Sequence, residues 1–99
     1  MNNEFLNFLG IAVRAGKIIT GTDMTLQGIR DNTVKLVIMA SDCSERTNKT
    51  MHDKANYYQT DIIDNFNSEE LKKSIGKDRK VMGITDLGIA KRLKEIMQK

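Results

Sequence analysis

The stretch Lys17-Ile18-Ile19-Thr20-Gly21-Thr22-Asp23-Met24-Thr25 decides the fold, because it predicts a strand that turns directly into a helix. Gly21 can adopt the backbone angles of a tight reversal. Thr22 is a good N-cap, since its hydroxyl can accept from a backbone N–H of the first turn. The N–H groups and the dipole of such a helix end attract anions, phosphates among them. An ordinary strand-to-helix turn has the same local pattern, so the stretch fits either a plain connection or a ligand site.

Outward from this corner, helical and strand spacings of apolar residues alternate along the whole chain. The predicted elements cover residues 3–15, 17–20, 23–31, 34–40, 45–56, 60–64, 68–75, 81–85 and the residues after 86. Predicted caps bound the helices, namely Asn2 or Asn3, Ser44, an Asn67–Glu70 capping box and Asp86 at their starts, and Gly16 and Gly76 at their ends. This alternation implies an α/β fold, a sheet covered by helices on both faces in a three-layer α/β/α sandwich. The strand order stays open.

Composition indicates one domain over residues 1–99. Hydrophobic residues make up 39% and charged residues 29% of the chain, which contains no proline, and this is a globular composition. A single cysteine excludes an internal disulfide and favours a reducing cytoplasm. The N-terminus lacks the basic region of a signal peptide, and no apolar run is long enough to span a membrane. We therefore expect a soluble, cytoplasmic protein.

The positive charge is concentrated in the last third of the chain. Residues 1–66 contain seven Lys or Arg residues and eight Asp or Glu residues. Residues 67–99 contain nine Lys or Arg residues and five Asp or Glu residues. Localised basic charge is typical of nucleic-acid binding, although plain solvated helices also carry such an excess.

The sequence offers no catalytic, cofactor or metal site. Neither a P-loop nor a Gly-x-Gly-x-x-Gly fingerprint occurs. Cys43 and His52 are the only thiol and imidazole, too far apart to form a nucleophilic pair and too few for zinc. The one functional role open to Cys43 is that of a thiol made more acidic by a helix N-terminus. Tyr57 and Tyr58 are expected to pack rather than to stack on bases.

A binding surface remains, because ligands of alternating α/β folds gather at loops along one sheet edge. Candidates are Lys17, the corner at 21–24, a helix stripe of Asp23, Gln27 and Arg30, and the charged loop at 77–80. Few aromatic residues are available for stacking on single strands. Recognition of structured RNA through its shape and backbone therefore fits better.

Several segments together resemble the kink-turn-binding ribosomal-protein family, the L-seven-Ae and L-thirty-e group. They are Leu9-Gly10-Ile11-Ala12-Val13-Arg14-Ala15-Gly16-Lys17, Gly21-Thr22-x-x-Thr25-Leu26, Val37-Ile38-Met39-Ala40-Ser41-Asp42-Cys43-Ser44, Ser74-Ile75-Gly76-Lys77 and Gly83-Ile84-Thr85-Asp86-Leu87-Gly88-Ile89-Ala90. The resemblance implies a mixed four-stranded sheet, no enzymatic activity, no cofactor, and a monomer that binds structured RNA, either a kink-turn or ribosomal RNA, in association with the ribosome. The RNA-binding positions that it implies are Lys17, Gly21, Thr22, Asp23, Met24, Gln27, Arg30, Lys77, Asp78, Arg79 and Lys80.

Three of these positions also support an alternative function. Asp23 and Met24 stand where strong kink-turn binders of the family carry a polar pair, and Gln27 stands in place of a lysine. Asp23 places a negative charge near phosphates, and Met24 cannot form the hydrogen bonds that read a guanine edge. The alternative is a protein-interaction module on the same fold that has lost specific RNA recognition.

Overall fold

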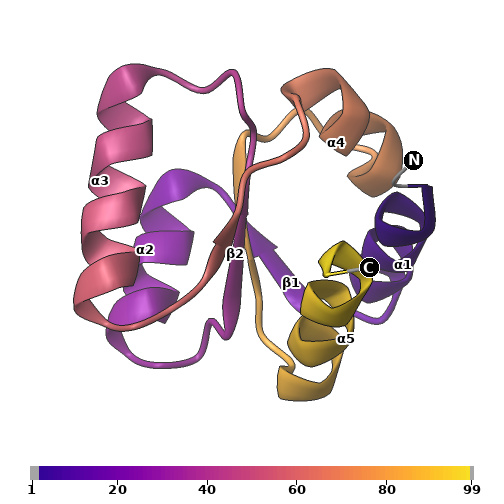
Figure 1. The fold of residues 1–99 in the computed structure, drawn as a ribbon, viewed down its shortest axis with the longest axis horizontal. Coiled ribbons are helices and arrows are strands. Elements are labelled where there is room, and N and C mark those ends of the chain that lie inside the picture. Colours follow the sequence, from indigo (N-terminus) through magenta and orange to yellow (C-terminus); the bar gives the residue numbers. More distant parts are fainter. Residues whose placement is uncertain (1–2, 99) are drawn as a thin grey trace.

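The computed structural model describes residues 3–98, which form three layers (Figure 1). The elements are α1 (Asn3–Arg14), β1 (Ile18–Thr20), α2 (Thr22–Arg30), β2 (Leu36–Met39), α3 (Glu45–Tyr57), β3 (Ile62–Ile63), α4 (Ser68–Ile75), β4 (Val81–Ile84) and α5 (Leu87–Met97). The predicted alternation and the three-layer α/β/α sandwich are confirmed. The observed strands are shorter than predicted by one to three residues.

The sheet has the order β1-β4-β2-β3 and is mixed, as the family resemblance implied. β4 runs antiparallel to both β1 and β2, while β3 runs parallel to β2. β1, β2 and β3 are therefore parallel to one another and end at the same edge of the sheet, where β4 begins. We call this side the carboxyl edge. Since α2, α3 and α4 follow these three strands, all three helices begin there.

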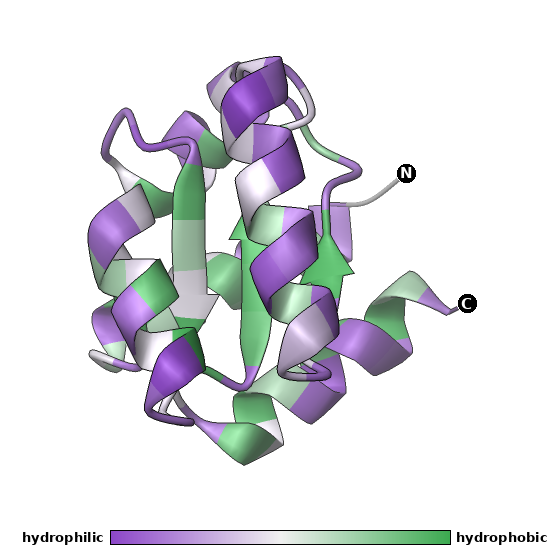
Figure 2. Ribbon diagram, turned by 90° about the vertical axis from the view of Figure 1, so that its left-hand side faces the viewer, coloured by the Kyte–Doolittle hydropathy of each residue, from purple (hydrophilic) through white to green (hydrophobic). Residues whose placement is uncertain are grey.

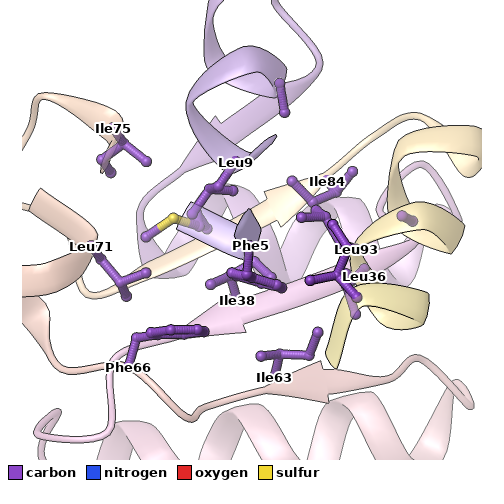
Figure 3. Close-up of a cluster of buried hydrophobic side chains, with 14 of the residues drawn as sticks. Phe5, Leu9, Leu36, Ile38, Ile63, Phe66, Leu71, Ile75, Ile84 and Leu93 are labelled. Atoms are coloured by element: carbon purple, nitrogen blue, oxygen red, sulfur yellow. The ribbon is translucent and has the colours of Figure 1, made fainter. Parts of the chain in front are cut away.

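Two hydrophobic clusters fill the space between the layers. α1, α4 and α5 cover one face of the sheet, and α2 and α3 cover the other (Figure 1). Leu36 and Ile38 of β2 point into the first cluster, which Figure 3 shows around the stacked rings of Phe5 and Phe66. Val37 and Met39 point into the second. Because alternate residues enter two different cores, the whole strand reads as one apolar run.

The predicted caps at Ser44, Asn67, Glu70 and Asp86 are all present, and the capping box is complete. Gly16 ends α1 with a left-handed backbone (φ 71°), and the N–H groups of residues 16 and 17 donate back to the last turn as in a Schellman motif. Asn3 is already helical, and the alternative cap Asn2 lies outside the described residues.

Two tyrosines at the end of α3, Tyr57 and Tyr58, are more exposed than predicted. Tyr57 is 78% exposed and Tyr58 38%, and their rings touch edge to face. The prediction that they pack is wrong, because Met51 and Ala55 form the buried side of α3 and both tyrosines remain in contact with solvent. Figure 2 shows hydrophobic strands behind this largely hydrophilic helix.

Among the described residues, no helix has the length and apolar character that a bilayer crossing requires.

Candidate nucleic-acid interface

The corner between β1 and α2 differs from the prediction in its cap. Gly21, not Thr22, is the N-cap residue, with φ 99° and ψ 149°, and no side chain accepts from the first turn. Thr22 is already the first helical residue. A positive φ at the turn favours glycine, and this displaces the cap by one position. Because no side chain caps α2, the N–H groups of its first turn remain open to an external acceptor such as a phosphate oxygen.

The loop at residues 77–80 lies directly beside this corner. The Gly21 N–H donates to the Val81 carbonyl at 2.8 Å, and the Ala40 N–H donates to the Lys80 carbonyl at 2.7 Å. The loop is thus held between the ends of β1 and β2. All four of its side chains are exposed, and three of them, on Lys77, Arg79 and Lys80, are cationic. The carboxyl edge therefore combines an uncapped helix start with a cluster of exposed cations.

A pair of residues that the sequence did not single out braces the same edge. The Ser68 N–H and hydroxyl donate to the two carboxylate oxygens of Asp42 at 2.9 and 2.7 Å. These hydrogen bonds hold the pKa of Asp42 below its ordinary value. They tie the start of α4 to the loop after β2. Twenty-six positions separate the two residues, so no local pattern in the sequence signals the contact.

The Cys43 thiol, next to Asp42 in the sequence, has a pKa above its ordinary value. Burial is the main cause that raises the pKa of Cys43, and the negative charges of Asp42 and Asp64 add to it. The predicted possibility of a thiol activated by a helix N-terminus is therefore wrong. Among residues 3–98, no cluster of His, Cys, Asp and Glu side chains could hold a metal ion.

The predicted stripe on α2 is exposed but extends away from the carboxyl edge. Asp23, Gln27 and Arg30 all face solvent, and Met24 in the first turn is 59% exposed. At about 1.5 Å of rise per residue, Arg30 lies roughly 10 Å further along the helix than Asp23. The Arg30 guanidinium donates to the Gln27 side chain at 3.5 Å. The stripe therefore flanks the corner, and Asp23 and Met24 are its residues nearest to Gly21.

Lys17 is not brought to the corner. Its carbonyl accepts from the Thr85 N–H at 3.0 Å, whereas Gly21 bonds to Val81 at the other end of β4. Four residues of extended chain, about 3.3 Å each, separate Lys17 from Gly21 by roughly 13 Å. The backbone of Lys17 lies at the end of the sheet opposite the carboxyl edge. Lys17 is therefore close to Gly21 in the sequence but not in space.

Solved structures share this architecture. A Bacillus halodurans protein of unknown function superposes with a TM-score of 0.92 at 32% identity, covering 96% of this chain and 97% of that one. The Giardia lamblia 15.5kD RNA binding protein superposes with a TM-score of 0.77 at 17% identity, over 98% and 88% of the two chains, and shows likeness of fold alone.

Two relatives in sequence cover nearly the whole chain, and both carry the name RNA-binding protein YlxQ. One, from Enterococcus faecium, is 44% identical over 94% of this chain and 90% of its own length. The other, from Bacillus subtilis, is 38% identical over 91% of each. A family model matches residues 3–94. The chain therefore belongs to the ribosomal protein L7Ae/L30e/S12e/Gadd45 family.

Proposed function

We propose that this protein is a non-enzymatic RNA-binding protein that binds structured RNA at the carboxyl edge. The observation that carries the proposal is the uncapped start of α2 beside the exposed cations of residues 77–80, joined by the Gly21–Val81 hydrogen bond. Helix N–H groups and cationic side chains are the groups that contact phosphates. The names of the two YlxQ relatives and of the Giardia protein support RNA as the ligand class.

Within this proposal the contacts have different roles. N–H groups at Thr22, Asp23 and Met24 hold a phosphate and set the register, while Gly21 lets the RNA backbone approach closely. The loop supplies electrostatic affinity, which is sequence-independent. Residues on the two flanks, Gln27 and Arg30 on α2 and Lys17 at the far end of β1, contact RNA only where it extends past the corner.

A kink-turn or ribosomal RNA is the proposed ligand, bound by a cytoplasmic monomer associated with the ribosome. A gel shift with a kink-turn RNA and an unkinked duplex of equal length tests the ligand. Preferential binding of the kinked RNA supports the proposal. Equal binding to both leaves general RNA binding and removes kink-turn specificity.

The contribution of the loop is measured by substituting Arg79→Ala together with Lys80→Ala. Each lost phosphate contact lowers the slope of log Kd against log salt by about 0.7–0.9, so the pair should lower it by about 1.5. The matched control substitutes Lys54→Ala together with Lys91→Ala, which removes the same charge from exposed positions on α3 and α5. An equal change in both variants would mean that overall charge, not the loop, accounts for binding.

The alternative, a protein-interaction module, has one specific observation in its favour. Asp23 and Met24 are both exposed at the corner, where an anion and a thioether oppose contact with phosphates and guanine edges. Undetectable RNA binding, together with a protein partner retained after nuclease treatment, would favour this alternative.

A further inference from the structure

The brace between Asp42 and Ser68 lies beside one cation of the loop at residues 77–80. β2 and β4 pair antiparallel, and the Ala40 N–H donates to the Lys80 carbonyl at 2.7 Å. Ala40 is therefore directly opposite Lys80, and Asp42 follows Ala40 two positions later. Figure 1 shows that the segments before and after α4 reach the same edge of the sheet as the end of β2.

Asp42 and Lys80 lie on the side of the sheet that α4 covers. The Ala40 side chain belongs to the first hydrophobic cluster, on the face against α1, α4 and α5. Directly opposite residues of an antiparallel pair point to the same face, so the Lys80 side chain leaves the backbone on that face. Ser68, which binds the Asp42 carboxylate, begins α4 there. The carboxylate and the ammonium are thus neighbours at the start of α4.

The two charges attract each other without forming an ion pair. The Ser68 hydrogen bonds are the main cause that lowers the pKa of Asp42, and the charge of Lys80 adds to it. Among the ion pairs of residues 3–98, none involves Lys80. Both carboxylate oxygens instead accept from Ser68, at 2.9 and 2.7 Å. The brace therefore holds the anion against α4 and leaves the Lys80 side chain exposed.

We propose that Ser68 is a positioning residue for RNA binding, because it keeps Asp42 from pairing with Lys80 and leaves that ammonium available to a phosphate. The inference rests on the proposed function. A carboxylate released from Ser68 can rotate toward the neighbouring cation, and an ammonium paired in this way must lose its partner before it contacts RNA. Ser68 acts through the orientation of one carboxylate, without a contact of its own to the RNA.

Substituting Ser68→Ala removes the hydroxyl that holds one carboxylate oxygen. An exposed ion pair between Asp42 and Lys80 would compete with RNA by a factor of about two to five. We therefore expect Ser68→Ala to raise the Kd for the kink-turn RNA by this factor at low salt. The slope of log Kd against log salt should fall by up to about 0.7–0.9, the value of one phosphate contact. The conservative variant Ser68→Thr keeps the hydroxyl and should restore both quantities.

Two further backgrounds separate this role from a structural one. Asp42→Asn removes the anion and Lys80→Ala removes the cation, so adding Ser68→Ala to either should leave its Kd unchanged. Ser44→Ala is the matched control, because it removes the capping hydroxyl of α3 at the same edge of the sheet. This control should lower stability without changing the Kd. Thermal unfolding verifies that every variant is folded at the temperature of the titration.

The outcomes distinguish this inference from the proposed function. An unchanged Kd for Ser68→Ala, or an equal loss in all three backgrounds, would overturn the inference while leaving RNA binding intact. A loss of the same size in Ser44→Ala would also overturn it, because helix stability would then account for the effect. Failure of the unsubstituted protein to bind either the kink-turn RNA or the unkinked duplex would overturn the proposed function, and the inference with it.

Discussion

Replacing Gly28 by alanine tests how closely α2 must approach the sheet that carries its N-terminal corner. A Cβ atom on Gly28 would lie 2.4 Å from a methyl group of Val34, closer than two carbon atoms can pack. Val34 is 2% exposed, and its methyl groups also fill the space that a Cβ atom on Gly83 would need, at 2.7 and 3.0 Å. The valine thus occupies the gap between two glycines, one on α2 and one on β4.

The expected effect is the difference between two opposing contributions. Alanine gains up to about 1 kcal/mol over glycine in helix propensity, whereas overpacking a closed core costs about 1–3 kcal/mol. Since an added Cβ on Gly28 would also meet Thr33 at 3.1 Å and Ile19 at 3.2 Å, we take the upper part of that range and expect Gly28→Ala to lose about 1–2 kcal/mol of unfolding free energy. For a domain of this size the midpoint of thermal unfolding falls by roughly 5–15 °C.

The close approach of α2 to the sheet is tested by measuring the free energy of unfolding by chemical denaturation. Four proteins are compared: the unsubstituted chain, Gly28→Ala, Val34→Ala and the double variant. Val34→Ala alone leaves a cavity and costs about 2 kcal/mol. In the double variant the new methyl group occupies part of that cavity, so the total loss should be smaller than the sum of the two. Gly88→Ala is the control, because its Cβ would meet only the Asp86 carboxylate at 3.3 Å. Unchanged stability of Gly28→Ala, or additive losses in the double variant, would refute the close-approach argument.

Two further predictions concern the carboxyl edge. Asp42→Ala should lower the midpoint of thermal unfolding at pH 7. The pKa of Asp42 is lowered in the folded protein, so the stabilisation that its carboxylate provides is lost when it is protonated. The difference in midpoint between the variant and the unsubstituted protein should therefore narrow as the pH falls below 3.8. A difference that stays constant between pH 7 and pH 2 would contradict it. Asp23→Asn should tighten RNA binding a few-fold at low salt by removing an anion from the corner, whereas Glu95→Gln on α5, the control for net charge, should change the Kd less.

Much of the fold could be predicted because its signals are local. The apolar run around β2 identified a central strand, and Ser44, Asn67 and Asp86 marked helix starts through hydrogen bonds that span three residues. The cap of α2 could not be found this way. The positive φ of Gly21 accompanies its hydrogen bond to Val81, a residue sixty positions further along the chain.

The candidate site was predicted less completely than the fold, because its residues are brought together by contacts between distant parts of the sequence. The corner and the loop at 77–80 are neighbours because β1 and β4 pair antiparallel, and the sequence did not fix that pairing. Lys17 was grouped with Gly21 because the two are close in sequence, yet a strand carries four residues roughly 13 Å. The Asp42–Ser68 brace joins two loops that only the sheet brings together.

The residues that hold α2 in place and the residues that it exposes to solvent are different sets. Thr25, Gly28 and Ile29 are buried against the sheet, whereas Asp23, Met24 and Gln27 face solvent. In the described part of the chain, the only side-chain hydrogen bond of these three is the 3.5 Å contact between Gln27 and Arg30. Packing therefore places no constraint on them, so substitutions there change recognition and leave the scaffold intact. Under the proposed function, the backbone groups of the corner and the loop cations supply affinity for any phosphate backbone, and the exposed face of α2 decides which RNA is preferred.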